Sequence, residues 1–196
     1  MKKIILLLSI SILLVGITSC KTSSNEKKES QKKEVDSNSY NFKTSFTKIL
    51  ENAKSYTLEV AETMAAEDYS FRTTDSVRTF GEQMAHIGMS NQFILVKLIM
   101  GEKLPDTDIT EQEIGASKEM TIALLNKSFD DIITALKAMD NKTLNEKFTI
   151  LFLPEKPEYL KHEGFVFLRD HITHHRGQAI VYLRAKGYKA PQYRAF

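Results

Sequence analysis

Three of the five histidines in this 196-residue chain lie within five consecutive positions. They are His171, His174 and His175, in the segment HITHHRGQ at residues 171–178. Imidazole nitrogens are common ligands of zinc, copper, iron and nickel. The segment therefore indicates part of a site for a divalent metal ion. A solvated polar helix, whose histidines bind nothing, is the alternative interpretation.

The helical spacing of the segment separates these histidines. On a helical wheel the apolar residues cluster roughly 60° to 120° from His171, and His175 lies at about 40°, beside that stripe. The stripe consists of Phe165, Leu168, Ile172, Ala179 and Leu183. Because His171 and His175 are four positions apart, they can converge on one point inside a helical bundle. His174 is expected to face solvent or the rim of a pocket.

Two imidazoles hold a metal ion only loosely, so the pair requires a third donor from another element. His86, within GEQMAHIGMSNQF, lies near the middle of another predicted helix. His162 precedes His171 by about 2.5 turns and is expected to lie too far along the axis. The spacing thus allows a three-histidine site. Histidines satisfied by core or surface contacts are the other outcome.

Four neighbouring side chains are candidates for supporting roles. Glu82, one turn before His86, is expected either to orient that ring, to act as a base, or to be a solvated acid. Arg176 and Gln178 belong to the histidine segment, and Arg176 is expected to lock its helix to a neighbour. Tyr182 lies on the histidine side of the helix and is interpreted as a core residue.

The apolar periodicity predicts an all-α domain. Only 4 Pro and 8 Gly interrupt the chain, and apolar residues recur mostly at helical spacing. Four helices are expected, at residues 46–66, 76–100, 110–139 and 158–186. Helices of this length with apolar stripes are typical of a four-helix bundle.

Several signals mark the ends of these helices. Asp75 or Ser76 is expected to cap the second helix, and Gly101 to end it. The third helix is expected to begin irregularly near Gly115, and the fourth to stop at Gly187. The connection at 140–157 contains the apolar stretch FTILFLP. This stretch is expected to cap one end of the bundle or to cover a pocket, and it has room for a short strand.

Three segments carry a family resemblance. They are GEQMAHIGMSNQF at 81–93, GEK at 101–103 and FLRDHITHHRGQAIVYLRAKGYKAPQY at 167–193. Together they resemble the DinB family of four-helix bundles, over residues 43 to 194. In that family one histidine of the second helix and two of an H-x-x-x-H-R-G-Q element bind a metal. The resemblance implies His86, His171 and His175 as ligands of a divalent metal ion, with zinc or nickel usual.

The same resemblance implies a metal-dependent enzyme acting on a small molecule. The family is similar in fold to thiol-dependent transferases and isomerases, so a thiol-dependent transferase and a hydrolase are both expected classes. The alternative is a non-catalytic metal-binding protein, in which the ion staples the helices of a structural or stress protein. A metal-free adhesion or interaction domain is a third interpretation. The sequence leaves open whether the chain forms a homodimer.

The first 42 residues differ in composition from the rest. Lys2 and Lys3, an apolar run and Ile17-Thr18-Ser19-Cys20 predict a lipoprotein-type signal peptide at 1–19, with lipidation of Cys20. The apolar run is too short for an ordinary membrane span. Residues 20–42 are rich in Ser, Lys and Glu and predict a flexible tether. The bundle domain is expected at 43–196.

The charge and the signal constrain the partners. The chain has 27 Lys and Arg, and removing Lys2 and Lys3 with the signal leaves 25, equal to the 25 Asp and Glu. A neutral chain without a basic stripe argues against nucleic-acid binding. We expect an exported protein, lipid-anchored to a membrane and periplasmic or surface-facing. Low-molecular-weight thiols are kept reduced in the cytoplasm, so export favours hydrolysis over thiol transfer.

Overall fold

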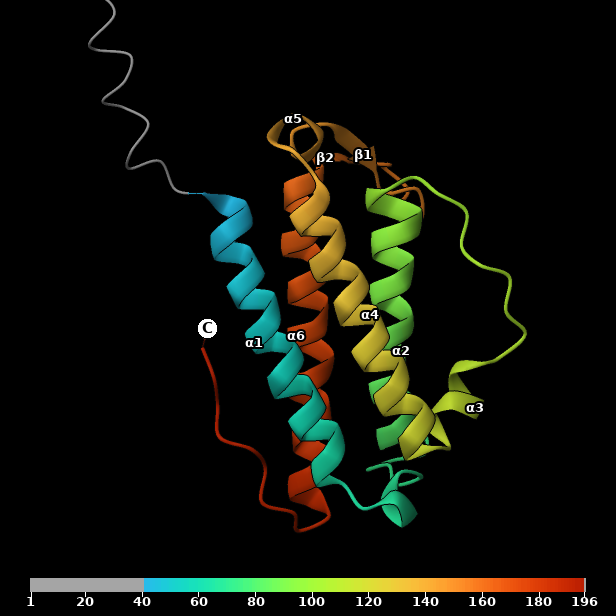
Figure 1. Cartoon of the computed structure of the whole chain (residues 1–196). Helices are drawn as coiled ribbons and strands as arrows, with labels where there is room; N and C mark the ends of the chain where they lie inside the picture. Colours follow the sequence, from blue (N-terminus) through green and yellow to red (C-terminus); the bar gives the residue numbers. More distant parts are fainter. Residues whose placement is uncertain (1–40, 196) are drawn as a thin grey trace, which may run out of the picture. The chain divides into compact units, whose positions relative to one another are not determined.

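The computed structural model describes residues 41–195. The predicted signal peptide at 1–19, Cys20 and most of the predicted tether lie outside these residues. Four long helical segments form a bundle (Figure 1): α1 (Phe42–Thr63), α2 (Phe80–Gln92) continued by the π-helix η2 (Phe93–Ile99), α4 (Lys118–Ala138) and α6 (Lys161–Ala185). The short elements are η1 (Ala66–Asp68), α3 (Glu111–Gly115), α5 (Asn141–Leu144), β1 (Lys147–Thr149) and β2 (Glu158–Leu160). The prediction of an all-α four-helix bundle is confirmed, with one small hairpin added.

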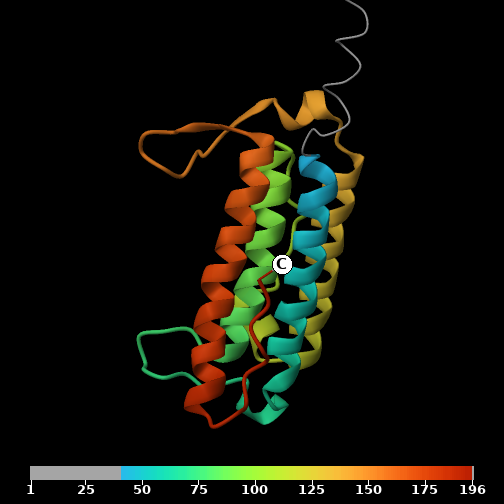
Figure 2. The ribbon, with the colours of Figure 1, turned by 90° about the vertical axis from the view of Figure 1, so that its left-hand side faces the viewer.

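The bundle has a long crossover connection. Helices α1 and α6 run in one direction, and α2 and α4 run in the other (Figures 1 and 2). Helix α1 packs against α4 and α6, and α2 packs against the same two helices. Because α2 and α4 are parallel, the chain after η2 must return along the length of the bundle before α4 begins (Figure 1). Helix α3 lies at the end of that return.

The apolar stripes of the long helices meet in one core. Every long helix supplies side chains that are completely shielded from solvent, including Leu50, Val60, Met84, Leu125, Phe129, Phe165 and Leu183. Burying a side chain of this size stabilises the fold by roughly 1.5 to 3 kcal/mol. Between residues 41 and 195, no helix combines the length and the hydropathy needed to cross a bilayer.

Both predicted glycine stops are confirmed, but the starts of α1 and α2 differ from prediction. Gly101 and Gly187 have φ angles of 72° and 86°, a left-handed conformation that commonly ends a helix. Helix α1 begins four residues early, at Phe42, because the Asn41 side chain caps it by accepting from the Thr44 N–H. Helix α2 begins at Phe80, and the predicted caps Asp75 and Ser76 lie in the loop before it.

The real cap of α2 is Thr79. Its hydroxyl accepts from the Glu82 N–H, and the Glu82 carboxylate accepts from the Thr79 N–H, which forms a capping box. This reciprocal pair satisfies two N–H groups at once, whereas Asp75 and Ser76 lie too early to reach the first turn. Of the roles considered for Glu82, the two at His86 are not seen, because its carboxylate is used by the cap.

The third and fourth predicted helices are also revised. A break at 116–117 separates α3 from α4. This break confirms the predicted irregular start near Gly115. The expected start of the fourth helix at Glu158 is wrong by three residues, because Glu158 to Leu160 pair with β1 as an antiparallel strand. The expected short strand in the connection is confirmed by β1. Within FTILFLP, Phe148 and Ile150 are buried at one end of the bundle.

Candidate metal centre

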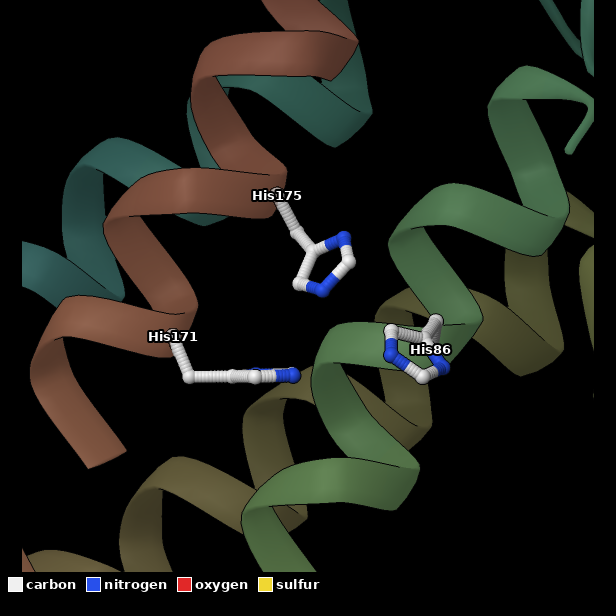
Figure 3. Close-up of side chains that lie close together, drawn as sticks. All are labelled: His86, His171 and His175. Carbon is white, nitrogen blue, oxygen red and sulfur yellow. The ribbon is translucent and has the colours of Figure 1, made fainter. Parts of the chain in front are cut away.

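Three histidine rings from two helices meet where α2 packs against α6. The ring centroids are 5.3 Å apart for His86 and His171, 4.5 Å for His86 and His175, and 4.4 Å for His171 and His175. One ring nitrogen of each residue lies within 4.8 Å of the corresponding nitrogens of the other two. Figure 3 shows the three rings turned toward a common space between the helices. The structure thus brings together all three predicted ligand residues.

The surroundings keep two of these rings neutral. Burial, together with the charges of His86, His174 and Arg78, lowers the pKa of His171 to about 4. Burial, together with the charges of its histidine neighbours and Arg78, lowers the pKa of His175 to about 3. Only 8% of His175 is exposed. Neutral imidazoles at physiological pH have a free lone pair, which is the form that binds a cation.

The ring of His86 is oriented by an acidic side chain from α3. Nδ1 of His86 lies 2.7 Å from Oε2 of Glu111, and the other carboxylate oxygen accepts from Nε of Arg78 at 2.5 Å. A carboxylate on one imidazole nitrogen holds the ring and directs the other nitrogen elsewhere. For His86 that other atom is Nε2, which lies 3.3 Å from the Ser90 hydroxyl.

His175 has a corresponding partner on α2. Its Nδ1 lies 2.7 Å from Nε2 of the buried Gln83. Gln83 also contacts Oε1 of Gln178, whose Nε2 lies 2.8 Å from Nε2 of His174. A half-turn of the Gln83 amide exchanges its nitrogen for its oxygen, so this side chain can face either an imidazole nitrogen or an imidazole N–H. Nε2 of His175 remains available to the centre.

The other two histidines lie outside the group. His174 is exposed, and its ring is turned to Gln178, as the helical wheel predicted. His162 lies at the start of α6, where Nδ1 is 3.2 Å from the Leu144 carbonyl oxygen and the ring packs edge-on against Phe42. The prediction that His162 lies too far along the helix to join the metal centre is confirmed.

Two further predicted roles are also confirmed. Arg176 is buried and donates to the Ala53 carbonyl and the Thr57 hydroxyl of α1, with its guanidinium 4.5 Å from the Tyr56 ring centroid. It therefore locks α6 to α1. Tyr182 is a core residue with 6% exposure. Burial raises the pKa of the Tyr182 hydroxyl.

The residues present fit a divalent cation. Nδ1 of His171 is buried and has no hydrogen-bond partner among residues 41–195, and an unsatisfied buried polar atom costs roughly 1 to 3 kcal/mol. Two of the three imidazoles also have a side chain on Nδ1, as metal-bound histidines generally do. Among residues 41–195 the group contains three imidazoles and no fourth ligand, a donor set that keeps coordination room.

Two supporting residues escaped the sequence analysis. Gln83 precedes His86 by three positions, so the helical spacing already placed it on the neighbouring surface of α2. Glu111 had no such signal, because 25 positions and a crossover separate it from His86. Only the packing of α3 on α2 brings its carboxylate to the ring.

Comparisons with known proteins agree with the fold. The fold resembles a DinB-like protein from Bacillus cereus ATCC 10987, at 20% identity and a TM-score of 0.61, over 72% of this chain and 91% of that one. It also resembles the DinB-like protein YjoA from Bacillus subtilis, at 17% identity and a TM-score of 0.59, over 76% and 96% of the two chains.

A third similar structure is YfiT from Bacillus subtilis, described as "a probable metal-dependent hydrolase with an unusual four-helix bundle topology". It is 16% identical with a TM-score of 0.59, over 89% of this chain and 97% of that one. No curated protein sequence matched the chain. The family model of the DinB superfamily matches residues 49–179. The chain therefore belongs to the DinB superfamily.

Proposed function

We propose that His86, His171 and His175 bind one divalent cation and that the protein is a metal-dependent enzyme, of the hydrolase type, acting on a small molecule. One observation carries this proposal: three imidazole nitrogens from two helices lie within 4.8 Å of one another. The description of YfiT as a metal-dependent hydrolase supports the same reaction class. Imidazole ligands suit zinc and nickel, which are the cations we propose.

The chain's own residues would prepare the site in three ways. The neutral rings of His171 and His175 leave the full charge of a cation uncompensated. Glu111 and Gln83 hold two of the rings in orientation from their Nδ1 atoms. Partial burial between α2 and α6 lowers the effective dielectric constant around the rings, which strengthens electrostatic interactions. A bound divalent cation supplies Lewis-acid chemistry, which polarises a carbonyl or phosphoryl oxygen and lowers the pKa of water.

The N-terminal sequence favours hydrolysis over thiol transfer within this proposal. We propose that Cys20 is lipidated and anchors the protein to a membrane outside the cytoplasm. A thiol-dependent transferase requires a supply of reduced low-molecular-weight thiol, which the cytoplasm provides. Water is available on both sides of the membrane.

Metal analysis tests the binding site directly. The purified protein is expected to contain about one divalent cation per chain, and His175→Ala to lose it. His162→Ala is the matched control, because this histidine lies on the same helix but contacts Leu144 instead of the centre. Equal metal content in the protein and its His175→Ala variant would sink the proposed site.

An activity screen tests the reaction class. Esters and amides form one arm, and electrophiles with an added thiol form the other. Turnover of an ester or amide that disappears in His175→Ala supports a hydrolase, and turnover only with thiol supports a transferase. The protein could instead bind metal, gain strong thermal stability from it and show no turnover in either arm. That result would support a structural metal ion that connects α2 to α6.

A further inference from the structure

Three consecutive apolar side chains project from the hairpin at one end of the bundle. Leu151 is 61% exposed, Phe152 is 56% exposed and Leu153 is 37% exposed. We call these three residues the apolar tip. The metal centre uses none of them. Runs of exposed apolar residues mark a surface that contacts a partner, because their exposure to water is unfavourable.

The base of the hairpin is firmly held. Phe148 packs so closely on Gly164 that a Cβ atom there would lie 2.9 Å from the phenyl ring. The Ile150 N–H donates to the Pro157 carbonyl, and the Lys161 N–H donates to the Glu146 carbonyl. The apolar tip is therefore presented by a docked hairpin. Phe93 of η2 extends the apolar surface, since its ring centroid lies 6.3 Å from that of Phe152.

The hairpin and the first described residues lie at the same end of the bundle. The Phe42 ring lies 5.6 Å from the ring of His162, which follows β2 by two residues. Figures 1 and 2 show the start of α1, α5 and the hairpin together at this end, with the loop between η1 and α2 at the opposite end. The segment that leads back to Cys20 thus joins the bundle at the end that carries the apolar tip.

We propose that the apolar tip inserts into the headgroup and acyl boundary of the bilayer that holds Cys20. This inference rests on the proposed lipid anchor. Residues 21–40 are 20 mostly polar positions. We propose that they form a flexible tether, which at that length would span about 25 Å on average, against roughly 33 Å for α1. Such a tether would hold the hairpin end of the bundle at a high effective concentration near the bilayer.

This orientation would keep the metal centre on the aqueous side of the inserted tip. Phe93, which contacts Phe152, lies seven residues after His86, about 10 Å along the helix axis. Interfacial segments insert only about 5 to 10 Å. A substrate could therefore reach the histidines from the aqueous phase while the tip is inserted.

A single tryptophan can report insertion, because the chain has none. Phe152→Trp places the probe in the apolar tip. Val77→Trp is the matched control, since Val77 is an apolar residue with 37% exposure in the loop at the opposite end. Both variants are studied as the mature chain on phosphatidylcholine vesicles with and without brominated acyl chains. The chain is attached through its native lipid or, if it carries none, by coupling Cys20 to a maleimide lipid.

We expect a blue shift and quenching by brominated lipid for Phe152→Trp, and neither for Val77→Trp. Equal quenching at both positions, or quenching at neither, would contradict the proposal that the apolar tip inserts into the bilayer. A blue shift at position 152 without lipid quenching would also overturn it, in favour of a tip covered by a second copy of the chain. Absence of the native lipid would refute only the anchor, because the coupled chain still tests the tip.

Discussion

The carboxylate of Glu111 lies 2.7 Å from Nδ1 of His86, although the two residues belong to different helices. The same carboxylate accepts from Arg78 through its other oxygen. Glu111 is thus held from one side and orients His86 from the other. This contact makes α3, a helix of five residues, part of the candidate metal centre.

Glu111→Ala is expected to weaken metal binding about 10- to 100-fold, because the His86 ring loses the partner that orients it. Competition with a chelator measures the affinity. Glu102→Ala is the control, since Glu102 is an exposed acid in the crossover. Equal losses in both variants would mean that the effect comes from overall charge.

Gln83→Leu is expected to weaken metal binding by roughly tenfold or more, because it leaves Nδ1 of the buried His175 without a partner. His174→Ala removes a histidine from the same hydrogen-bonded chain but is exposed, so its metal content should stay unchanged. Titration of both variants with zinc tests the difference. Loss of metal from His174→Ala would assign this residue to the centre.

Gly81→Ala should destabilise the fold by about 1 to 3 kcal/mol, since overpacking forces backbones apart. A methyl carbon at Gly81 would overlap the Gly115 carbonyl oxygen where α2 meets α3. Displacement of α3 should also weaken metal binding through Glu111. Thermal and chemical denaturation measure the stability.

Gly177→Ala supplies the contrast. Beyond the neighbouring backbone of α6 itself, an added methyl group there meets no atom of the described chain within 4 Å. The substitution should therefore stabilise the protein by about 0.5 to 1 kcal/mol, because alanine favours the helix. A loss of stability would show that the position has a packing role.

The stability of the metal-free protein should fall as the pH falls from about 6.5 to 4. The pKa of His171 is lowered to about 4 and that of His175 to about 3, both from 6.5. In this window the unfolded chain binds protons that the folded chain does not, so each histidine lowers stability by at most about 1.4 kcal/mol per pH unit.

A variant with both His171→Gln and His175→Gln isolates this effect. Its free energy of unfolding should depend less steeply on pH than that of the unaltered chain, because the carboxylates titrate in both proteins. Urea denaturation at several pH values in the window gives the two slopes. Parallel slopes would contradict the lowered pKa values.

Removal of the metal should lower the melting temperature. A cation present at 100 times its dissociation constant stabilises the folded state by about 2.7 kcal/mol, which is roughly 5 to 10 °C for a domain of this size. Calorimetry with and without chelator measures the shift. The shift should vanish in His171→Ala and persist in His162→Ala.

The amino-acid sequence alone determined the four long helices. It also determined that two of the three candidate ligands, His171 and His175, lie together on one helix face. Apolar spacing follows from 3.6 residues per turn, so the four long helices and the inward side of α6 could be predicted from local pattern. The four-residue separation of His171 and His175 places them together on any α-helix. Gly101 and Gly187 end helices for an equally local reason, the conformational freedom of glycine.

Only the tertiary structure decided how His86 meets that pair and what supports the centre. The Thr79 cap of α2, in contrast, is a local feature, since Thr79 and Glu82 are only three positions apart. The approach of Glu111 to His86 depends on two glycines, Gly81 and Gly115, which let α3 and α2 touch backbone to backbone. Such contacts join residues far apart in the chain, and their energy comes from packing in three dimensions, which no local periodicity records.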